Sequence, residues 1–310
     1  MTGINKVAIV GAGLVGSGWA IVFARAGTTV RIFDGDAGIR ASVLGHIAAS
    51  LAELRDIGLV DDVDAVLGRI SVADSLAEAL ADADYVQESV FERTDVKTAV
   101  SLEIDRAMRP EAIVGSSSSG IPASAFTEGC ANRSRFLIAH PVNPPHLVPV
   151  VELVPAPWTD PAVVPAVRDL MERVGQVPVV VTREVEGFIL NRLQGALLNE
   201  AWALFEEGYA TAADIDKTVS YGLGYRWSFM GPFETIDLNA PGGVADYAAR
   251  LGPLYHAIAQ DRTAPRPWSE ELVGRVTAER RAALPVGDLA ERRAWRDRKL
   301  MQLVAHKRGG

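Results

Sequence analysis

The sequence is poor in cysteine, in basic residues and in long apolar runs. Cys130 is the only cysteine among 310 residues, which excludes an intramolecular disulfide framework and fits a reducing cytosol. The 31 basic residues are outnumbered by 39 acidic ones, giving a net charge of −8, so a nucleic-acid partner is not expected. No apolar run reaches the roughly 18 residues of a membrane helix, and a strand-like run begins at Lys6, too early for a signal peptide to precede it. We therefore expect a cytoplasmic protein that binds neither nucleic acid nor a membrane.

The first 180 residues alternate short β-branched runs with helical patterns. Hydrophobic residues make up 48% of the chain and charged residues 23%, an ordinary globular composition, and the length suits two domains. Uninterrupted apolar runs are typical of strands covered on both faces by helices. Their alternation with helices predicts an α/β fold with a Rossmann-type, doubly wound, mostly parallel sheet. The expected strands are residues 6–10, 30–33, 85–87, 112–114, 136–139, 150–154 and 177–181.

Beyond Thr182 only helical patterns remain. Residues 188–205 are apolar around nearly the whole helix circumference, which predicts a helix buried inside a domain or at a subunit interface. We therefore expect an α/β domain at residues 1–184, a smaller all-helical domain at residues 185–310, and a homodimer. The further expected helices are residues 212–221, 233–239, 243–260, 269–283 and 289–306.

A glycine-rich turn follows the first expected strand. The segment Gly11-Ala12-Gly13-Leu14-Val15-Gly16 joins that strand to an expected helix at residues 17–26, the context in which such glycines bind a dinucleotide. The first glycine permits a tight turn, the second lets the pyrophosphate approach, and the third lets helix and strand pack closely. The N-terminus of the helix then attracts the phosphates.

Asp34 ends the second strand, 18 residues after the last of these glycines. A carboxylate there accepts hydrogen bonds from the adenosine ribose hydroxyls and repels a 2′-phosphate, which favours NAD over NADP. Arg31 and Arg40 are the nearby cations, and neither is placed to reverse this preference.

Polar residues also cluster in the second half of the α/β domain. His140 ends a strand, where ligands bind in open α/β sheets, and a histidine side chain is a common general base in catalysis. Glu152 lies on the next strand, a serine run occupies residues 116–119, and Asn191 lies in the apolar helix. Taken singly, each has an ordinary structural explanation, such as a hydrogen-bonded histidine or a surface carboxylate.

At these residues the chain resembles the 3-hydroxyacyl-CoA dehydrogenase superfamily over essentially its full length. Active sites there combine a serine in a Ser/Thr-rich loop, the histidine of His-x-x-Asn-Pro, a glutamate twelve residues later and the asparagine of Gly-Phe-hydrophobic-x-Asn-Arg. The matching residues here are Ser118, His140 with Asn143, Glu152 and Asn191. The resemblance implies that His140 is the general base, that Glu152 orients it, and that Ser118 and Asn191 hold the reacting oxygen.

The same resemblance implies the cofactor contacts. An acid and a lysine five residues apart are matched by Glu92 and Lys97, and Ser118 and Asn143 are implied to contact NAD as well. The remaining implied NAD contacts come from the glycine-rich turn and the second strand: Gly11, Gly13, Leu14, Val15, Gly16 and Asp34. The helical domain is implied to supply the substrate cleft and the dimer contacts, and no metal ion is expected.

Several segments resemble the L-gulonate 3-dehydrogenase branch of the superfamily. One is His140-Pro141-Val142-Asn143-Pro144-Pro145, where acyl-CoA enzymes usually read His-Phe-Phe-Asn-Pro. Arg226 precedes a second such segment, Gly231-Pro232-Phe233-Glu234. Its guanidinium could grip a substrate carboxylate with two hydrogen bonds, and a salt bridge to an acid such as Glu234 is the alternative.

The resemblance thus implies an NAD-dependent dehydrogenase that oxidises the 3-hydroxyl of a small anionic hydroxy acid, L-gulonate or a relative. Three alternatives stay open. A 3-hydroxyacyl-CoA, such as 3-hydroxybutyryl-CoA, is one possible substrate. A cationic hydroxy acid such as carnitine is another, since Trp227 could contribute to an aromatic cage for its ammonium. The third is a non-catalytic, crystallin-like NAD-binding protein, against which the intact set of Ser118, His140, Glu152 and Asn191 speaks.

Overall fold

The computed structural model describes residues 4–262, 264 and 266–309. The chain forms two compact units, one of residues 1–193 with 293–310 and one of residues 194–292. These units differ from the division expected between residues 184 and 185. The reason lies at the end of the chain, where Met301 is buried in the core of the first unit and Leu300 and Val304 pack against that core.

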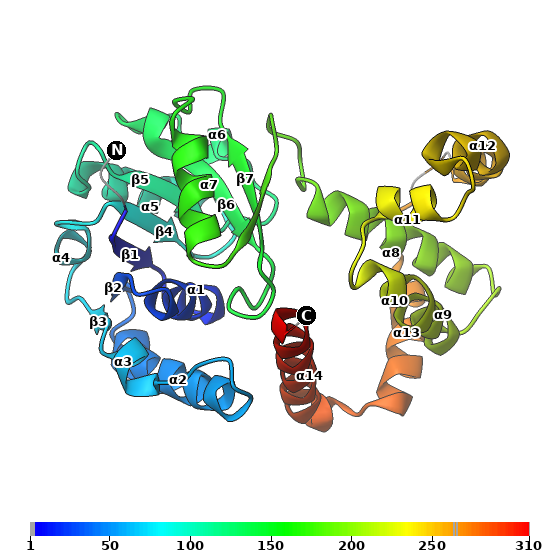
Figure 1. Ribbon diagram of the computed structural model, residues 1–310, viewed down its shortest axis with the longest axis horizontal. Helices are drawn as coiled ribbons and strands as arrows, with labels where there is room; N and C mark the ends of the chain where they lie inside the picture. Colours follow the sequence, from blue (N-terminus) through cyan, green and yellow to red (C-terminus); the bar gives the residue numbers. More distant parts are fainter. Residues whose placement is uncertain (1–3, 263, 265, 310) are drawn as a thin grey trace. The chain divides into compact units, whose positions relative to one another are not determined.

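The first unit is built on one eight-stranded sheet (Figure 1). Its strand order is β3-β2-β1-β4-β5-β6-β7-β8, so the Rossmann-type, mostly parallel sheet expected from the sequence is confirmed. Every neighbouring pair is parallel except β6 and β7. The strands are β1 (Lys6–Val10), β2 (Thr29–Phe33), β3 (Ile70–Val72), β4 (Tyr85–Glu88), β5 (Ile113–Ser116), β6 (Phe136–Pro141), β7 (Val150–Pro155) and β8 (Val177–Val180).

The edge strand β3 was not expected from the sequence. It has three residues and only its first is buried, so it carries too little apolar pattern to be recognised. Its backbone pairing with β2 holds it in a strand although its own sequence carries no strand pattern.

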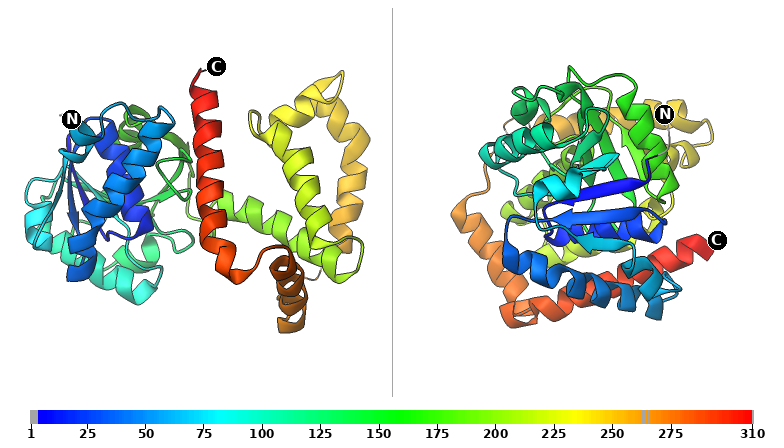
Figure 2. Two further views of the ribbon diagram at one scale, coloured as in Figure 1. Left: turned by 90° about the horizontal axis from the view of Figure 1, so that it is seen from below. Right: turned by 90° about the vertical axis from the view of Figure 1, so that its left-hand side faces the viewer.

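Alternating residues of β1 pack into two separate cores, one on each face of the sheet. On β1, Val7 and Ile9 join the core that contains α1, whereas Ala8 and Val10 join the core that contains Ile104 of α5. Helices therefore cover both faces of the sheet, as Figure 2 shows in its right-hand view. The helices of this unit are α1 (Leu14–Arg25), α2 (Ala37–Asp56), α3 (Val63–Leu67), α4 (Leu76–Leu80), α5 (Thr94–Ala107), α6 (Ser124–Thr127), η1 (Arg133–Arg135) and α7 (Val163–Arg173).

Helices are the only regular secondary structure in the described part of the second unit, and turns connect them. Helix α8 (Leu190–Glu206) leads into it from the first unit, and α14 (Leu289–Gly309) returns from it. Between them lie α9 (Ala212–Thr218), a π-helical turn η2 (Val219–Leu223), α10 (Gly224–Trp227), α11 (Pro232–Leu238), α12 (Gly243–Asp261), α13 (Glu270–Ala283) and η3 (Val286–Asp288). No helix in the described part of the chain combines the length and apolar character needed to cross a membrane.

Helix α8 corrects one expectation. Its apolar circumference predicted burial inside a domain or at a subunit interface, yet none of its residues is buried within this chain. Leu193 is 60% exposed and Leu198 is 37% exposed. Burial inside the domain was therefore wrong, because the other helices of the second unit leave the side chains of α8 partly exposed.

Candidate active site

The glycine-rich turn has the geometry of a phosphate-binding loop. Gly11 has φ of 97°, and a side chain there would lie 2.6 Å from the carbonyl oxygen of Ser89. A Cβ on Gly16 would lie 1.9 Å from the carbonyl oxygen of Gly11. A Cβ on Gly13 would meet nothing within 4 Å. Gly11 and Gly16 are therefore required by the turn itself, whereas Gly13 leaves open space beside the N-terminus of α1.

That open space belongs to a cavity of about 790 Å³ at the carboxyl ends of β1, β2 and β4. The sequence order of the strands reverses here, which is where ligands bind in sheets of this kind. The N-terminus of α1 has no capping side chain and no acid in its first turn, so its N–H groups are available to an anion. Residues expected to bind the cofactor that line the cavity are Gly11, Gly13, Leu14, Val15, Asp34, Glu92 and Asn143.

Three residues expected to contact the cofactor do not line this cavity. Gly16 lies beneath the turn, against Gly11. Lys97 and Ser118 are fully buried, so the structure places both behind residues that face the cavity.

Asp34 uses both carboxylate oxygens within its own loop. Oδ2 accepts a hydrogen bond from the N–H of Ala12 at 2.7 Å, and Oδ1 accepts one from the N–H of Asp36 at 2.9 Å. Arg31 is engaged elsewhere, because it pairs with Asp82 at 2.6 Å. Arg40 donates to the backbone carbonyl of Asp34 at 2.7 Å. The carboxylate is thus fixed at the edge of the cavity with its remaining lone pairs free for hydroxyl donors.

His140 and Glu152 form a buried pair. They stand directly opposite each other in the antiparallel register of β6 and β7, and His140 Nδ1 lies 2.8 Å from Glu152 Oε2. Glu152 Oε1 accepts hydrogen bonds from the backbone N–H groups of Ile189 at 2.8 Å and Leu190 at 2.9 Å. The left-handed backbone of Phe188, with φ of 51°, makes the turn that presents these two groups.

The hydrogen bonds decide the charge of this pair. Burial opposes ionisation of Glu152, but the hydrogen bonds from His140, Leu190 and Ile189 outweigh it and hold the pKa of the carboxyl below its ordinary value. An ionised Glu152 accepts hydrogen bonds only, so Nδ1 of His140 must carry a proton. Within the part of the chain that the structure describes, Nε2 of His140 has no hydrogen-bond partner. The arrangement presents the lone pair of Nε2 as a base.

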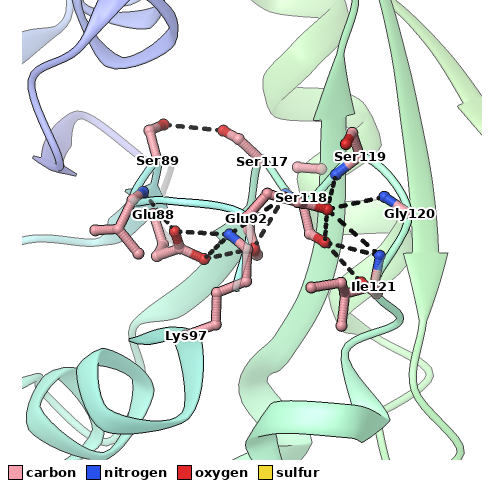
Figure 3. A network of polar contacts seen from close by, with 12 residues as sticks. Glu88, Ser89, Glu92, Lys97, Ser117, Ser118, Ser119, Gly120 and Ile121 are labelled. Carbon is pink, nitrogen blue, oxygen red and sulfur yellow. Dashed lines mark hydrogen bonds and ion pairs between the residues drawn. The ribbon is translucent and has the colours of Figure 1, made fainter. Parts of the chain in front are cut away.

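The serine loop is held by Glu92 (Figure 3). Glu92 Oε1 accepts hydrogen bonds from the N–H groups of Ser119 at 2.8 Å and Gly120 at 3.0 Å. Ser118 Oγ lies 2.9 Å from the same oxygen and 2.7 Å from the carbonyl oxygen of Ile121, and its single proton can serve only one of them at a time. Burial works against ionisation of Glu92, yet these bonds and the charge of Lys97 lower the pKa of the carboxyl.

Glu88 is the member of this network that the sequence did not reveal. Its buried carboxylate lies 3.1 Å from Lys97 Nζ through each oxygen and accepts a hydrogen bond from Ser116 Oγ at 2.5 Å. Lys97 lies farther from Glu92, at 3.8 Å. The signal for Glu88 was its place directly after the apolar run expected as a strand at residues 85–87, and the structure makes it the last residue of β4.

Asn191 joins the serine loop from the first turn of α8. Its Nδ2 donates to the carbonyl oxygen of Ser119 at 2.5 Å. Ser118, Asn191 and the His140–Glu152 pair are therefore linked through the loop and the start of α8, all inside the first unit.

Arg226 lies on α10 of the second unit. Among the described residues it forms no ion pair with Glu234 or with another acid. The salt bridge considered as its alternative role is thus absent there, and a carboxylate anchor stays a prediction.

Comparison with known proteins agrees with this geometry. The NAD binding domain of 3-hydroxyacyl-CoA dehydrogenase matches residues 6–185, and the C-terminal domain of 3-hydroxyacyl-CoA dehydrogenase matches residues 187–284. Lambda-crystallin of Oryctolagus cuniculus is 37% identical over 98% of this chain and 97% of its own length. L-carnitine dehydrogenase of Pseudomonas aeruginosa is 36% identical over 93% of this chain and 90% of its own.

A solved structure extends the similarity to the whole chain. The 5-formyl-3-hydroxy-2-methylpyridine 4-carboxylic acid 5-dehydrogenase, described as an NAD⁺-dependent dismutase, superposes with a TM-score of 0.82 at 27% identity, covering 98% of each chain. The chain uses NAD and is an oxidoreductase acting on a CH–OH group. With both domains matched and the cofactor turn in place, the chain belongs to the 3-hydroxyacyl-CoA dehydrogenase family.

Proposed function

We propose that this dehydrogenase oxidises the 3-hydroxyl of a small hydroxy acid resembling L-gulonate, with His140 as the general base. The observation that carries the proposal is the buried 2.8 Å contact between His140 Nδ1 and Glu152 Oε2. It leaves Nε2 of a neutral imidazole able to accept the hydroxyl proton.

In the proposed reaction Nε2 of His140 takes the proton of the substrate hydroxyl. NAD, when bound, supplies the hydride acceptor. Glu152 then faces an imidazolium, whose positive charge it stabilises at close range. Asn191, whose side chain is tied to the loop at residues 118–121, is the proposed partner of the reacting oxygen. Ser118 is buried within that loop and is proposed to position it.

The residues around the cavity suit NAD. The open N-terminus of α1 beside Gly13 would receive the pyrophosphate, and Asp34 would accept the ribose hydroxyls. Glu92 and Asn143 also line the cavity, and we propose that they contact NAD near its nicotinamide end. Lys97 and Ser118 would support them from behind, since neither lines the cavity.

Two observations favour a free hydroxy acid as the substrate. L-carnitine dehydrogenase, a relative over nearly the full chain, is named for a hydroxy acid. Arg226 also has no acidic partner among the described residues, which leaves its guanidinium available to a substrate carboxylate. The family match keeps a 3-hydroxyacyl-CoA as the second candidate. L-carnitine itself is a third candidate substrate. Trp227, which is 43% exposed, could contact its ammonium group through a cation–π interaction.

A substrate panel tests these candidates. L-gulonate, 3-hydroxybutyrate, L-carnitine and 3-hydroxybutyryl-CoA are each assayed with NAD, and kcat/KM is taken from the absorbance of the reduced cofactor. We expect the highest value with an anionic hydroxy acid and a large loss of turnover in His140→Ala. A preference for the thioester would overturn the proposed substrate. Inactivity on the whole panel, with NAD still bound, would favour the non-catalytic, crystallin-like role.

We also propose a homodimer in the cytoplasm, with α8 at the subunit interface and the helical domain, residues 185–310, supplying substrate and dimer contacts. The exposed Leu193 and Leu198 support the interface, since an apolar helix left uncovered by its own chain calls for a partner. Light scattering on the purified protein measures the mass. A monomer at micromolar concentration would refute the dimer.

A further inference from the structure

We propose that Asp36 is a second determinant of the preference for NAD over NADP, acting beside Asp34. Asp36 lies two residues beyond Asp34 and lines the same cavity, together with Gly35 and Ile39. Asp34 accounts for the affinity for ribose hydroxyls; Asp36 closes the place where a 2′-phosphate would otherwise bind.

Asp36 caps the N-terminus of α2. Its Oδ1 accepts hydrogen bonds from the N–H groups of Gly38 at 2.7 Å and Ile39 at 3.1 Å. Helix α2 has 20 residues, and the free N–H groups at the start of such a helix attract an anion. The chain's own carboxylate already occupies two of these groups, so an incoming phosphate finds a negative charge where the helix would offer donors.

The N-termini of α1 and α2, both at the cavity, differ in whether a side chain caps them. The N-cap of α1 is Gly13, which has no capping side chain, and the first turn of α1 contains no acid. The N-cap of α2 is Asp36, whose carboxylate caps the helix. An open N-terminus suits the pyrophosphate that NAD and NADP share. A closed N-terminus discriminates against the additional phosphate that only NADP carries.

Arg40 is the cation that a 2′-phosphate would require, and it is held in place. It donates to the carbonyl oxygens of Asp34 at 2.7 Å and Gly35 at 3.3 Å, and its guanidinium lies 5.7 Å from the ring centre of Phe33. Asp34 and Asp36 place two negative charges on the same short segment. Once both are neutral, Arg40, which bonds the backbone of the cavity-lining Asp34 and Gly35, remains as the nearby positive charge.

The experiment measures binding of cofactor fragments, so it does not depend on turnover or on the proposed substrate. Dissociation constants for ADP-ribose and 2′-phospho-ADP-ribose are obtained by calorimetry for the native protein, Asp34→Ser, Asp36→Asn and the double variant. Asparagine caps a helix about as well as aspartate, so Asp36→Asn removes the charge and keeps the cap. Asp62→Asn is the matched control, because Asp62 caps α3 through the N–H of Ala65 and does not line the cavity.

We expect Asp36→Asn to shift the ratio of the two dissociation constants toward the phosphorylated fragment by about tenfold, in the native and in the Asp34→Ser background. Asp62→Asn should leave the ratio unchanged, and Arg40→Ala in the double variant should abolish most of the gain. Asp34→Ser alone reaching the ratio of the double variant would overturn the proposal. Equal changes in both dissociation constants on Asp36→Asn would also overturn it, because a loop effect would not discriminate between the fragments.

Discussion

Replacing Glu152 with glutamine tests the acid–base mechanism with little change in shape. The glutamine oxygen can still accept the hydrogen bonds that Ile189 and Leu190 now donate to Oε1. Its NH₂ group must then face Nδ1 of His140, where the carboxylate oxygen lies at 2.8 Å in the native protein. Two donors cannot bond to each other, so the proton of His140 is expected to move to Nε2. The nitrogen proposed to receive the substrate proton then has no lone pair to offer.

Two effects determine how much kcat falls in Glu152→Gln. The imidazolium loses a charge-assisted hydrogen bond, worth about 1.5–3 kcal/mol, which alone slows the reaction roughly 10- to 150-fold. The tautomer change removes the base as well, for a combined loss of about 10²–10⁴ in kcat. We expect KM for NAD to change little, because neither His140 nor Glu152 lines the cofactor cavity.

Stability as a function of pH gives a second readout. The pKa of Glu152 is lowered from an ordinary 4.5, so its ionised form stabilises the folded chain fully above about pH 4.5. That contribution is lost as pH falls from about 4.5 through the lowered pKa, because the unfolded chain binds a proton in this range before the folded chain does. Measured by urea unfolding, the stability difference between native protein and Glu152→Gln should shrink as pH falls below about 4.5. A variant that keeps kcat within threefold of the native value would refute the proton-relay reasoning.

Four further perturbations follow from the same geometry. His140→Ala should lose about 10²–10⁴ in kcat and still bind NAD in a calorimetric titration; near-native turnover would return His140 to a structural role. Gly13→Ala should keep the melting temperature, since its Cβ meets nothing within 4 Å, but should weaken NAD binding; unchanged affinity would mean that no cofactor approaches there. Asp34→Ala should weaken NAD and improve turnover with NADP, and a native enzyme that prefers NADP would contradict this assignment. Arg226→Ala should lower kcat/KM for a free hydroxy acid about ten- to a hundredfold, with little recovery in Arg226→Lys; an equal loss with a CoA thioester would make Arg226 structural.

Much of the fold was predictable because its causes are local. Buried parallel strands require continuous apolar runs, which can be recognised in a short stretch of sequence. The glycine turn requires a positive φ at Gly11 and close contact at Gly16, and both depend on neighbouring residues. Strand β3 was missed because three residues carry no readable period. The burial of α8 was misjudged because an apolar surface says that a helix needs a partner and does not say whether its own chain supplies one.

The fold class, the position of the cofactor turn and the acid at Asp34 could be predicted because each depends on residues close together in the chain. Which polar groups meet could not be predicted in this way. His140 faces Glu152 because β6 and β7 pair antiparallel in one register, and a shift by one residue would turn one of them to the other face of the sheet. Glu88 pairs with Lys97 because a strand and the following helix bury both side chains together. A buried charge must find an opposite charge, but which one it finds depends on the packing of distant segments.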